Sequence, residues 1–284
     1  MRAQFQKWLV VPLIAAVILL LFISARDRLI PDPIFATFDT ENFDHPTVID
    51  NKWLPFKPGT QLVFEGFTIE NGEKVPHTVI ITVTDLTKKI AGVSSVVTWD
   101  QDISAGELVE AELAFFAQDN DGAVWRMGEY PEEYLDGAVV DAPTWIHGFK
   151  GARAGVAMMA DPQTGTPSYA QGWGPDVDWN DRGQVHQQGQ KVCVPAGCYE
   201  DVLVISETSR SEKGAFQLKY YAPVVGNILV GWTGADRTQE TLELVQILQL
   251  GPEEFAQARA RALELEASAY ERSKDVYVHT PPLE

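Results

Sequence analysis

The densest group of oxygen-bearing side chains in this sequence lies in the phrase PDVDWNDRG. Calcium takes about six to eight oxygen ligands, and alternating carboxylates and amides in a glycine-rich loop offer them. The phrase departs from an EF-hand loop, because the sixth position is Asp181 instead of glycine and the twelfth is Gln187 instead of glutamate. A weak calcium site at Asp176, Asp178, Asn180 and Asp181 is therefore one hypothesis, and a solvated acidic loop is the other. No other cofactor is predicted.

The histidines are scattered, and neither H-E-x-x-H nor H-x-H occurs. A site that uses imidazole would have to combine distant segments, for example those of His147 and His186. No G-x-S-x-G motif occurs, and Ser168 or Ser206 with a remote His and Asp is an arrangement found in almost any chain. Catalytic residues therefore stay unassigned. An extracytoplasmic hydrolase acting on a carbohydrate or an ester, with carboxylates and one of these histidines, stays open as an alternative.

Aromatic residues offer a second kind of site. The segment 141–190 loses the regular alternation of the flanking sequence, and long irregular segments in compact domains are often functional loops. We predict a ligand site in this segment, formed by Trp145, Trp173, Trp179, His147 and His186. Other aromatic residues either form the core or line a cavity for an apolar or sugar-like ligand: Trp53, Phe56, Phe64, Trp99, Phe115, Phe116, Trp125, Tyr220, Tyr221 and Trp232.

The two cysteines, Cys193 and Cys198, flank the residues Val-Pro-Ala-Gly. A pair on either side of a turn can approach to the separation that a disulfide requires, and such bonds persist in oxidising compartments. We predict a disulfide at the tip of a hairpin. A metal site is disfavoured, because there is no C-x-x-C and no second cysteine pair.

Most of the predicted secondary structure that would hold these candidate residues consists of β-strands. Runs rich in Val, Ile, Thr and aromatic residues recur between turn residues, among them Asn71-Gly72 and Asp121-Gly122. Such spacing is typical of antiparallel hairpins. We predict an all-β domain over residues 49–250, an antiparallel barrel or sandwich, with the irregular loop 141–190 inside it.

One helix is predicted after the strands, over residues 251–274, followed by a tail at 275–284. Pro252 fits the first helical position, and the acidic residues that follow it favour the positive end of the helix dipole. An apolar stripe that includes three alanines would let the helix lie close to the sheet or dock a partner: Phe255, Ala258, Ala262, Leu265 and Ala269.

The N-terminal segment has the features of a membrane-targeting sequence. An apolar run from Trp8 to Ile23 is bracketed by basic residues within residues 1–28, so this segment is a signal anchor or a signal peptide. We favour the anchor, because the bulky Ile23 stands where a cleavage site needs a small residue. Residues 29–48, rich in proline, are expected to form an extended tether along the surface. The predicted location is a bacterial inner membrane, crossed once, with the C-terminal domain in the periplasm or at the cell surface, or secretion if the segment is cleaved.

The net charge of −18 limits the partners. A strongly acidic surface repels phosphate backbones, and neutralisation of phosphates supplies most of the affinity of nucleic-acid binding. Nucleic acid is therefore excluded as a partner.

Five phrases in order resemble a widespread family of secreted or membrane-anchored bacterial β-rich proteins. They are NKWLPFKPGTQLVFEG, AQDNDGAVWRMGE, GARAGVAMMADPQTGTPSYAQ, VPAGCYEDVLVISE and KYYAPVVGNIL, within residues 49–247. The family has no assigned activity, so the resemblance implies an extracytoplasmic β-rich fold and no reaction. The chain departs from the family in its paired cysteines and its helical tail.

Together these observations favour a membrane-tethered extracytoplasmic β domain that acts as a noncatalytic binding or accessory module. Its partner would be an apolar small molecule or an envelope protein. Besides the hydrolase, a second alternative is an accessory subunit or maturation factor of a membrane complex, docking through the anchor and the alanine-striped helix.

Overall fold

The computed structural model describes residues 32–284, and residues 34–284 form one compact unit. The predicted membrane segment 1–28 lies outside the described residues. Within the described part of the chain, no helix combines the length and apolar character needed to cross a membrane.

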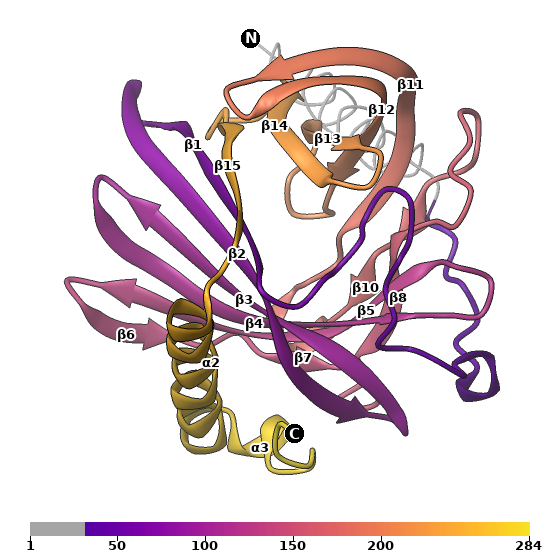
Figure 1. The fold of residues 1–284 in the computed structure, drawn as a ribbon, viewed down its shortest axis with the longest axis vertical. Helices are drawn as coiled ribbons and strands as arrows, with labels where there is room; N and C mark the ends of the chain where they lie inside the picture. Colours follow the sequence, from indigo (N-terminus) through magenta and orange to yellow (C-terminus); the bar gives the residue numbers. More distant parts are fainter. Residues whose placement is uncertain (1–31) are drawn as a thin grey trace, which may run out of the picture. The chain divides into compact units, whose positions relative to one another are not determined.

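Antiparallel strands dominate this unit (Figure 1). Its fifteen strands within residues 32–284 are β1 Thr60–Glu70, β2 Glu73–Ile90, β3 Val93–Ser104, β4 Glu107–Gln118, β5 Val124–Leu135, β6 Ala138–Asp141, β7 Trp145–Ile146, β8 Arg153–Met158, β9 Tyr169–Ala170, β10 Gly172–Trp173, β11 Arg182–Val194, β12 Gly197–Thr208, β13 Ala215–Ala222, β14 Gly226–Gly234 and β15 Thr241–Gln249. The short 3-10 helix η1 Thr40–Asn42 precedes β1, and the second, η2 Pro175–Val177, lies between β10 and β11.

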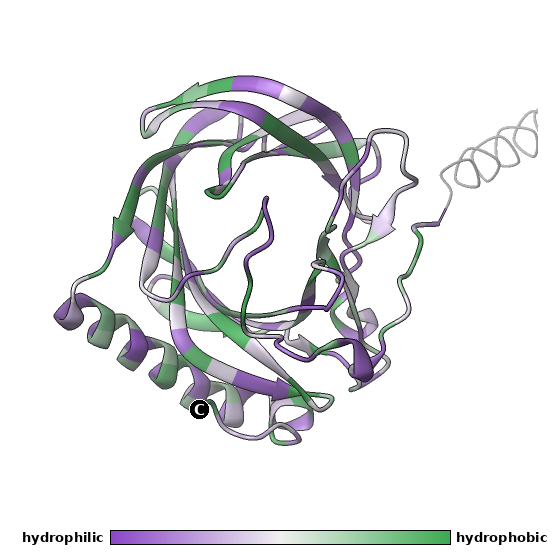
Figure 2. Ribbon diagram, turned by 45° about the vertical axis from the view of Figure 1, so that its right-hand side comes forward, coloured by the Kyte–Doolittle hydropathy of each residue, from purple (hydrophilic) through white to green (hydrophobic). Residues whose placement is uncertain are grey.

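The strands form a single sheet in the order β10-β8-β5-β4-β3-β2-β1-β15-β14-β13-β12-β11-β9, with β6 and β7 beside β5. The strands of the sheet curl round toward one another, as the view in Figure 2 shows. It is not closed by strand pairing, but its terminal strands β9 and β10 are separated in the chain only by Gln171. The predicted all-β antiparallel class with a C-terminal helix is confirmed.

Tight turns of the expected kind join neighbouring strands. Asn71 and Gly72 between β1 and β2 have φ angles of 52° and 85°. A two-residue hairpin turn matches the twist of its strands when both residues have positive φ, which Asn and Gly tolerate best. The expected turn before β5 is also present, where the Asp119 carboxylate accepts a hydrogen bond from the Ala123 N–H at 2.8 Å.

The two faces of the sheet pack into two different apolar cores. Leu113 and Phe115 of β4 belong to the core under the C-terminal helices, whereas Ala114 and Phe116 belong to the core inside the curl. Alternate side chains of a strand point to opposite faces, so one strand serves both cores. The inner face of the curl therefore carries an apolar core of its own.

The helix α2 Pro252–Arg272 covers the outer face together with α3 Lys274–Tyr277 (Figure 2). It lies within the expected range 251–274 and begins after Gly251, with Pro252 in its first turn. The predicted apolar stripe packs toward β2 and β4, and four of its five members are buried: Ala258, Ala262, Leu265 and Ala269. Docking of a partner on this stripe would require α2 to leave its own sheet.

A fully buried ion pair lies beneath α2. The Lys88 side chain of β2 is 0% exposed, and its Nζ lies 2.8 Å from Glu266 Oε1. Its ammonium also lies 3.9 Å from the centroid of the Tyr277 ring. Glu266 further accepts a hydrogen bond from the Leu283 N–H at 2.9 Å, so the pair joins the sheet, α2 and the C-terminal tail.

Two stretches expected to be irregular are more ordered than the sequence suggests. The segment 141–190 contains β7 to β10, η2 and the first part of β11. Strands of two residues are too short to show alternation, which explains why the sequence pattern misses them. The described part of the expected tether packs on the unit, with the ring centroids of Phe38 and Phe43 at 5.5 and 6.1 Å from that of Trp125.

Candidate ligand-binding site

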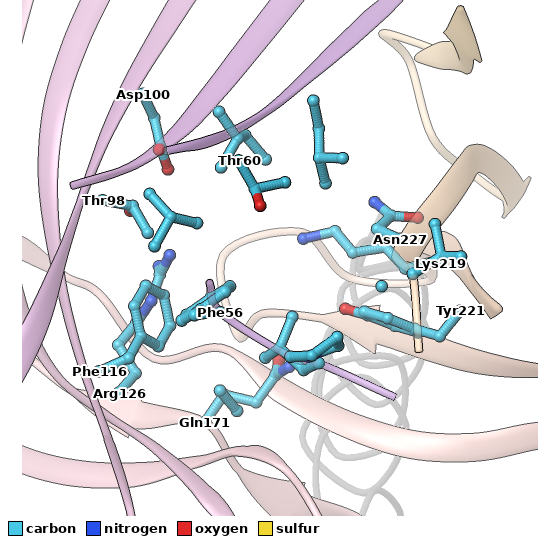
Figure 3. Close-up of a pocket in the computed structure, with 18 of the residues that line it drawn as sticks. Phe56, Thr60, Thr98, Asp100, Phe116, Arg126, Gln171, Lys219, Tyr221 and Asn227 are labelled. Carbon is cyan, nitrogen blue, oxygen red and sulfur yellow. The ribbon is translucent and has the colours of Figure 1, made fainter. Parts of the chain in front are cut away.

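A cavity of about 170 Å³ lies inside the curled sheet (Figure 3). Its apolar wall consists of aliphatic and aromatic side chains: Leu54, Phe56, Leu62, Ile81, Val83, Phe116, Ala157, Trp179, Tyr221 and Val225. Its polar wall carries hydroxyl, amide and charged groups: Thr60, Thr98, Asp100, Arg126, Gln171, Asp181, Glu207, Lys219 and Asn227. Figure 3 places Asp100, Thr98 and Arg126 on one side of the cavity and Lys219, Tyr221 and Asn227 on the other.

Distant strands supply the two sides. Thr98 and Asp100 come from β3 and Arg126 from β5, whereas Lys219 and Tyr221 come from β13. These strands lie far apart in the strand order and approach each other only because the sheet curls. The cavity is therefore a product of the fold and not of one loop.

The segment before β1 enters the curl and forms part of the wall. A bridge between Ile49 and Phe56 folds it back on itself, and the Val224 N–H donates a hydrogen bond to the Lys52 carbonyl at 2.7 Å. The centroids of the Phe56 and Phe116 rings lie 4.9 Å apart. This arrangement fixes an aromatic ring at the cavity.

Arg126 is the central cation of one side. Its Nη1 lies 2.7 Å from Glu129 Oε2, and its Nη2 lies 3.9 Å from Glu112 Oε1. Burial alone would lower the pKa of Arg126, but Glu129, Glu112 and Asp100 raise it further than burial lowers it. Burial, and then the charge of Glu112, raises the pKa of Glu129 well above its usual range. The guanidinium therefore stays charged in a site that holds more carboxyl groups than it can pair.

Lys219 is the cation of the opposite side. Its Nζ lies 2.7 Å from Glu207 Oε2, while the other oxygen of Glu207 accepts a hydrogen bond from Gln171 at 2.7 Å. Burial would lower the pKa of Lys219, but the Glu207 carboxylate outweighs it and raises the pKa. Asp181 lies nearby, and burial followed by the charge of Glu207 raises its pKa to about 6.

Asp100 and Glu112 face each other across β3 and β4 as direct register partners. Like charges in directly opposed positions destabilise a sheet. Burial, and then Glu112, raises the pKa of Asp100 well above its usual range. Three buried oxygens here have no hydrogen-bond partner: Thr98 Oγ1, Asp100 Oδ1 and Glu112 Oε1.

The acidic network continues from the cavity toward His77. Asp102 and Glu110 are the next register pair on β3 and β4. The His77 imidazole lies between two carboxylates, 3.0 Å from Glu240 Oε1 and 3.3 Å from Asp102 Oδ1. Burial would lower the pKa of His77, but Glu240 and Asp102 raise it. Burial raises the pKa of Asp102 to about 6 and, with Glu112, that of Glu110 to about 8.

The tryptophans predicted to bind ligand do not all reach the cavity. Trp179 lines it. Trp145 is 2% exposed and packs behind it, with its ring centroid 4.7 Å from that of Trp179. Trp173 instead makes an edge contact with Phe35 at 6.4 Å between centroids.

The two predicted histidines have separate surroundings. His147 lies against Phe38, with ring centroids 4.4 Å apart, and its Nδ1 accepts a hydrogen bond from the Ala154 N–H at 3.1 Å. Burial lowers the pKa of His147. His186 is exposed on β11. Neither histidine is among the side chains that line the cavity.

The four predicted calcium ligands point to different partners. Asp176 lies 3.3 Å from Lys150 Nζ, and Asp178 accepts a hydrogen bond from the Asn180 amide at 3.1 Å. Asn180 accepts one from the Arg210 N–H at 2.6 Å, whereas Asp181 lines the cavity. Within residues 32–284, no group of three or more His, Cys, Asp or Glu side chains is arranged to hold a metal ion.

The predicted disulfide between Cys193 and Cys198 is present at the turn from β11 to β12, with the Cα atoms 4.0 Å apart. The two cysteines are direct register partners across this hairpin. The bond therefore closes the hairpin tip as the sequence predicts.

Sequence reasoning identified part of the cavity lining. Among the aromatic residues named as candidates, Phe56, Phe116, Trp179 and Tyr221 line the cavity. Of the charged residues that line the cavity, Asp181 was named, as a calcium ligand, and Asp100, Arg126, Glu207 and Lys219 were missed. The available indication was a basic residue inside an apolar strand run, as in AVWRMGE and AFQLKYYA, which hold Arg126 and Lys219.

Comparison with known proteins gives distant likenesses only. No family model and no curated protein matches the chain. A candidate exported protein with a YmcC-like fold from Bacteroides fragilis NCTC 9343 shares 13% identity with a TM-score of 0.40, over 70% of this chain and 99% of that one. A candidate lipoprotein from Parabacteroides distasonis ATCC 8503 shares 12% identity with a TM-score of 0.37, over 70% and 100% of the two chains. At these TM-scores the likeness assigns neither family nor function.

Proposed function

We propose that this protein is an extracytoplasmic β domain, held at the membrane by residues 1–28, that binds a small molecule inside its curled sheet without catalysing a reaction. The flanked apolar run at the N-terminus supports the export, and the Cys193–Cys198 disulfide suits an oxidising compartment.

The cavity carries the proposal. Ligand sites are typically concave and mostly apolar, with a few placed polar groups that orient the ligand. Here aromatic walls such as Phe56 and Trp179 face polar atoms, two of which, Thr98 Oγ1 and Asp100 Oδ1, have no partner in the protein. Buried polar atoms that lack a partner cost about 1 to 3 kcal/mol each, so a ligand that satisfied them would be stabilised. A cavity of about 150 Å³ accepts a benzene-sized molecule, so the ligand or its buried part is small.

Filling the cavity is expected to abolish binding. Ala157 of β8 lines the cavity and is half-buried, so an Ala157→Phe side chain would occupy the ligand's space. The measurement is native mass spectrometry of the full chain extracted from its own membrane. The wild type should carry a mass excess of roughly 100 to 300 Da that disappears on denaturation, and the variant should not.

Ala138→Phe is the matched control, because Ala138 is exposed on β6 and does not line the cavity. It should keep the mass excess of the wild type. A wild-type protein with no excess mass, or an Ala157→Phe variant that retains it in full, would contradict the proposal.

A further inference from the structure

Carboxyl groups outnumber basic groups around the cavity. Arg126 is engaged with Glu129 at 2.7 Å, and Lys219 with Glu207 at the same distance. Asp100 lies opposite Glu112 in the sheet, and the cation that acts on it, Arg126, is already paired with Glu129. The side of the cavity near Asp100 therefore has more carboxyl groups than cations, and a bound cation would favour the ionised form of Asp100.

An independent observation points to a hydrogen-bond donor at the same place. Thr98 is 1% exposed, lines the cavity, and its Oγ1 has no hydrogen-bond partner in the protein. Asp100 Oδ1, two residues along the same strand face, is also without a partner. In Figure 3 the two side chains lie together at one side of the cavity. The Thr98 hydroxyl interacts with the Asp100 carboxyl but makes no hydrogen bond of ordinary length. Both oxygens can still accept a hydrogen bond, which suits a ligand group with more than one N–H.

The rest of the wall suits an apolar body next to that group. The rings of Phe56, Phe116 and Trp179 line the cavity, and aromatic faces attract cations. The Arg126 guanidinium already lies 5.2 Å from the Phe116 ring centroid and 5.6 Å from that of Trp179. The cavity is therefore built to hold positive charge beside aromatic rings.

We propose that the ligand of this cavity is a small organic cation, with an ammonium or amidinium group that donates to Asp100 and Thr98 and a compact apolar body against Phe56 and Trp179. This inference rests on the proposed function. It adds the chemical class of the ligand and the residues that select it.

Three probes of nearly the same shape test the class: benzylamine as the cation, benzyl alcohol as the neutral form and benzoate as the anion. Their affinities for the full chain are measured by titration calorimetry near neutral pH. Benzylamine should bind at least about tenfold more tightly than benzyl alcohol, which corresponds to about 1.4 kcal/mol, and benzoate should give no measurable binding. Asp100→Asn should weaken benzylamine at least about tenfold and leave benzyl alcohol within about twofold.

Asp178→Asn is the control, because Asp178 is exposed and does not line the cavity. It should bind all three probes as the wild type does. Thr98→Val is a second variant, which keeps the side-chain shape and lacks the hydroxyl. It should weaken the binding of benzylamine but not that of benzyl alcohol, and it serves as the test if Asp100→Asn does not fold.

The outcomes separate the two proposals. Equal binding of benzylamine and benzyl alcohol, both lost in Ala157→Phe, would overturn the cationic class and leave the binding cavity in place. Tighter binding of benzoate would overturn it in the same way. No binding of any probe to a folded wild type would count against both proposals.

Discussion

Replacement of Lys88 by methionine is expected to lower the free energy of unfolding by about 3 to 5 kcal/mol. Lys88 is fully buried, and the change would leave the Glu266 carboxylate under α2 without its cation. An unpaired buried charge costs more than the pair itself contributes, because its desolvation is no longer compensated. Urea unfolding of the wild type and the variant, followed by tryptophan fluorescence, measures the difference.

The double variant Lys88→Met with Glu266→Leu separates the charge from the packing. Apolar replacement of a buried pair is often neutral or stabilising, so the double variant should recover most of the lost stability. Lys191→Met, which breaks the exposed contact between Lys191 and Glu200, should cost less than about 1 kcal/mol. A Lys88→Met variant as stable as Lys191→Met would refute the role assigned to the buried pair.

Stability is expected to fall as the pH rises from about 5 to 8. The pKa of Glu110 is raised from 4.5 to about 8 and that of Asp102 from 3.8 to about 6, so the folded state holds protons that the unfolded chain has lost. The raised pKa of His77 acts in the same direction, because its stabilising contribution is lost as the pH rises through that pKa. The loss attributable to Glu110 is on the order of 2 to 4 kcal/mol.

Glu110→Gln tests the assignment, because glutamine does not titrate. The variant should be close to the wild type in stability near pH 5, more stable than the wild type near pH 8, and flatter between them. Chemical unfolding at several pH values provides the comparison. Glu132 acts in the opposite direction below about pH 4.5. Burial would raise its pKa, but hydrogen bonds from Ser268 and Tyr130 lower it, so its contribution to stability is lost as the pH falls. A wild type whose stability rises steadily from pH 5 to 8 would contradict this account.

The sequence predicted the fold class because its indications are local. Each indication depends on a few neighbouring positions: the alternation of apolar residues, turn residues such as Asn71-Gly72, and the proline at the start of α2. The turn and the helix start are present in the structure. The curl was not predictable in the same way. It depends on pairing between β1 and β15, whose partners Thr60 and Gln249 lie at opposite ends of the domain.

The charged half of the site was hidden for a related reason. A charged residue at an alternate strand position, such as Asp100 or Lys219, ordinarily indicates the solvent face. Only the curl of the sheet turns that face into an interior. Trp179 and Asp181 were named as candidates, Trp179 for a ligand and Asp181 for calcium, because they lie in a segment whose irregular composition is visible locally.

A crystal structure of the protein purified from its own membrane would show directly whether the cavity holds a small molecule. We expect non-protein density between the Phe56 and Trp179 rings, with a polar atom within hydrogen-bond distance of Thr98 Oγ1 and Asp100 Oδ1. Ordered water filling the cavity and satisfying these oxygens, with no other density, would contradict it.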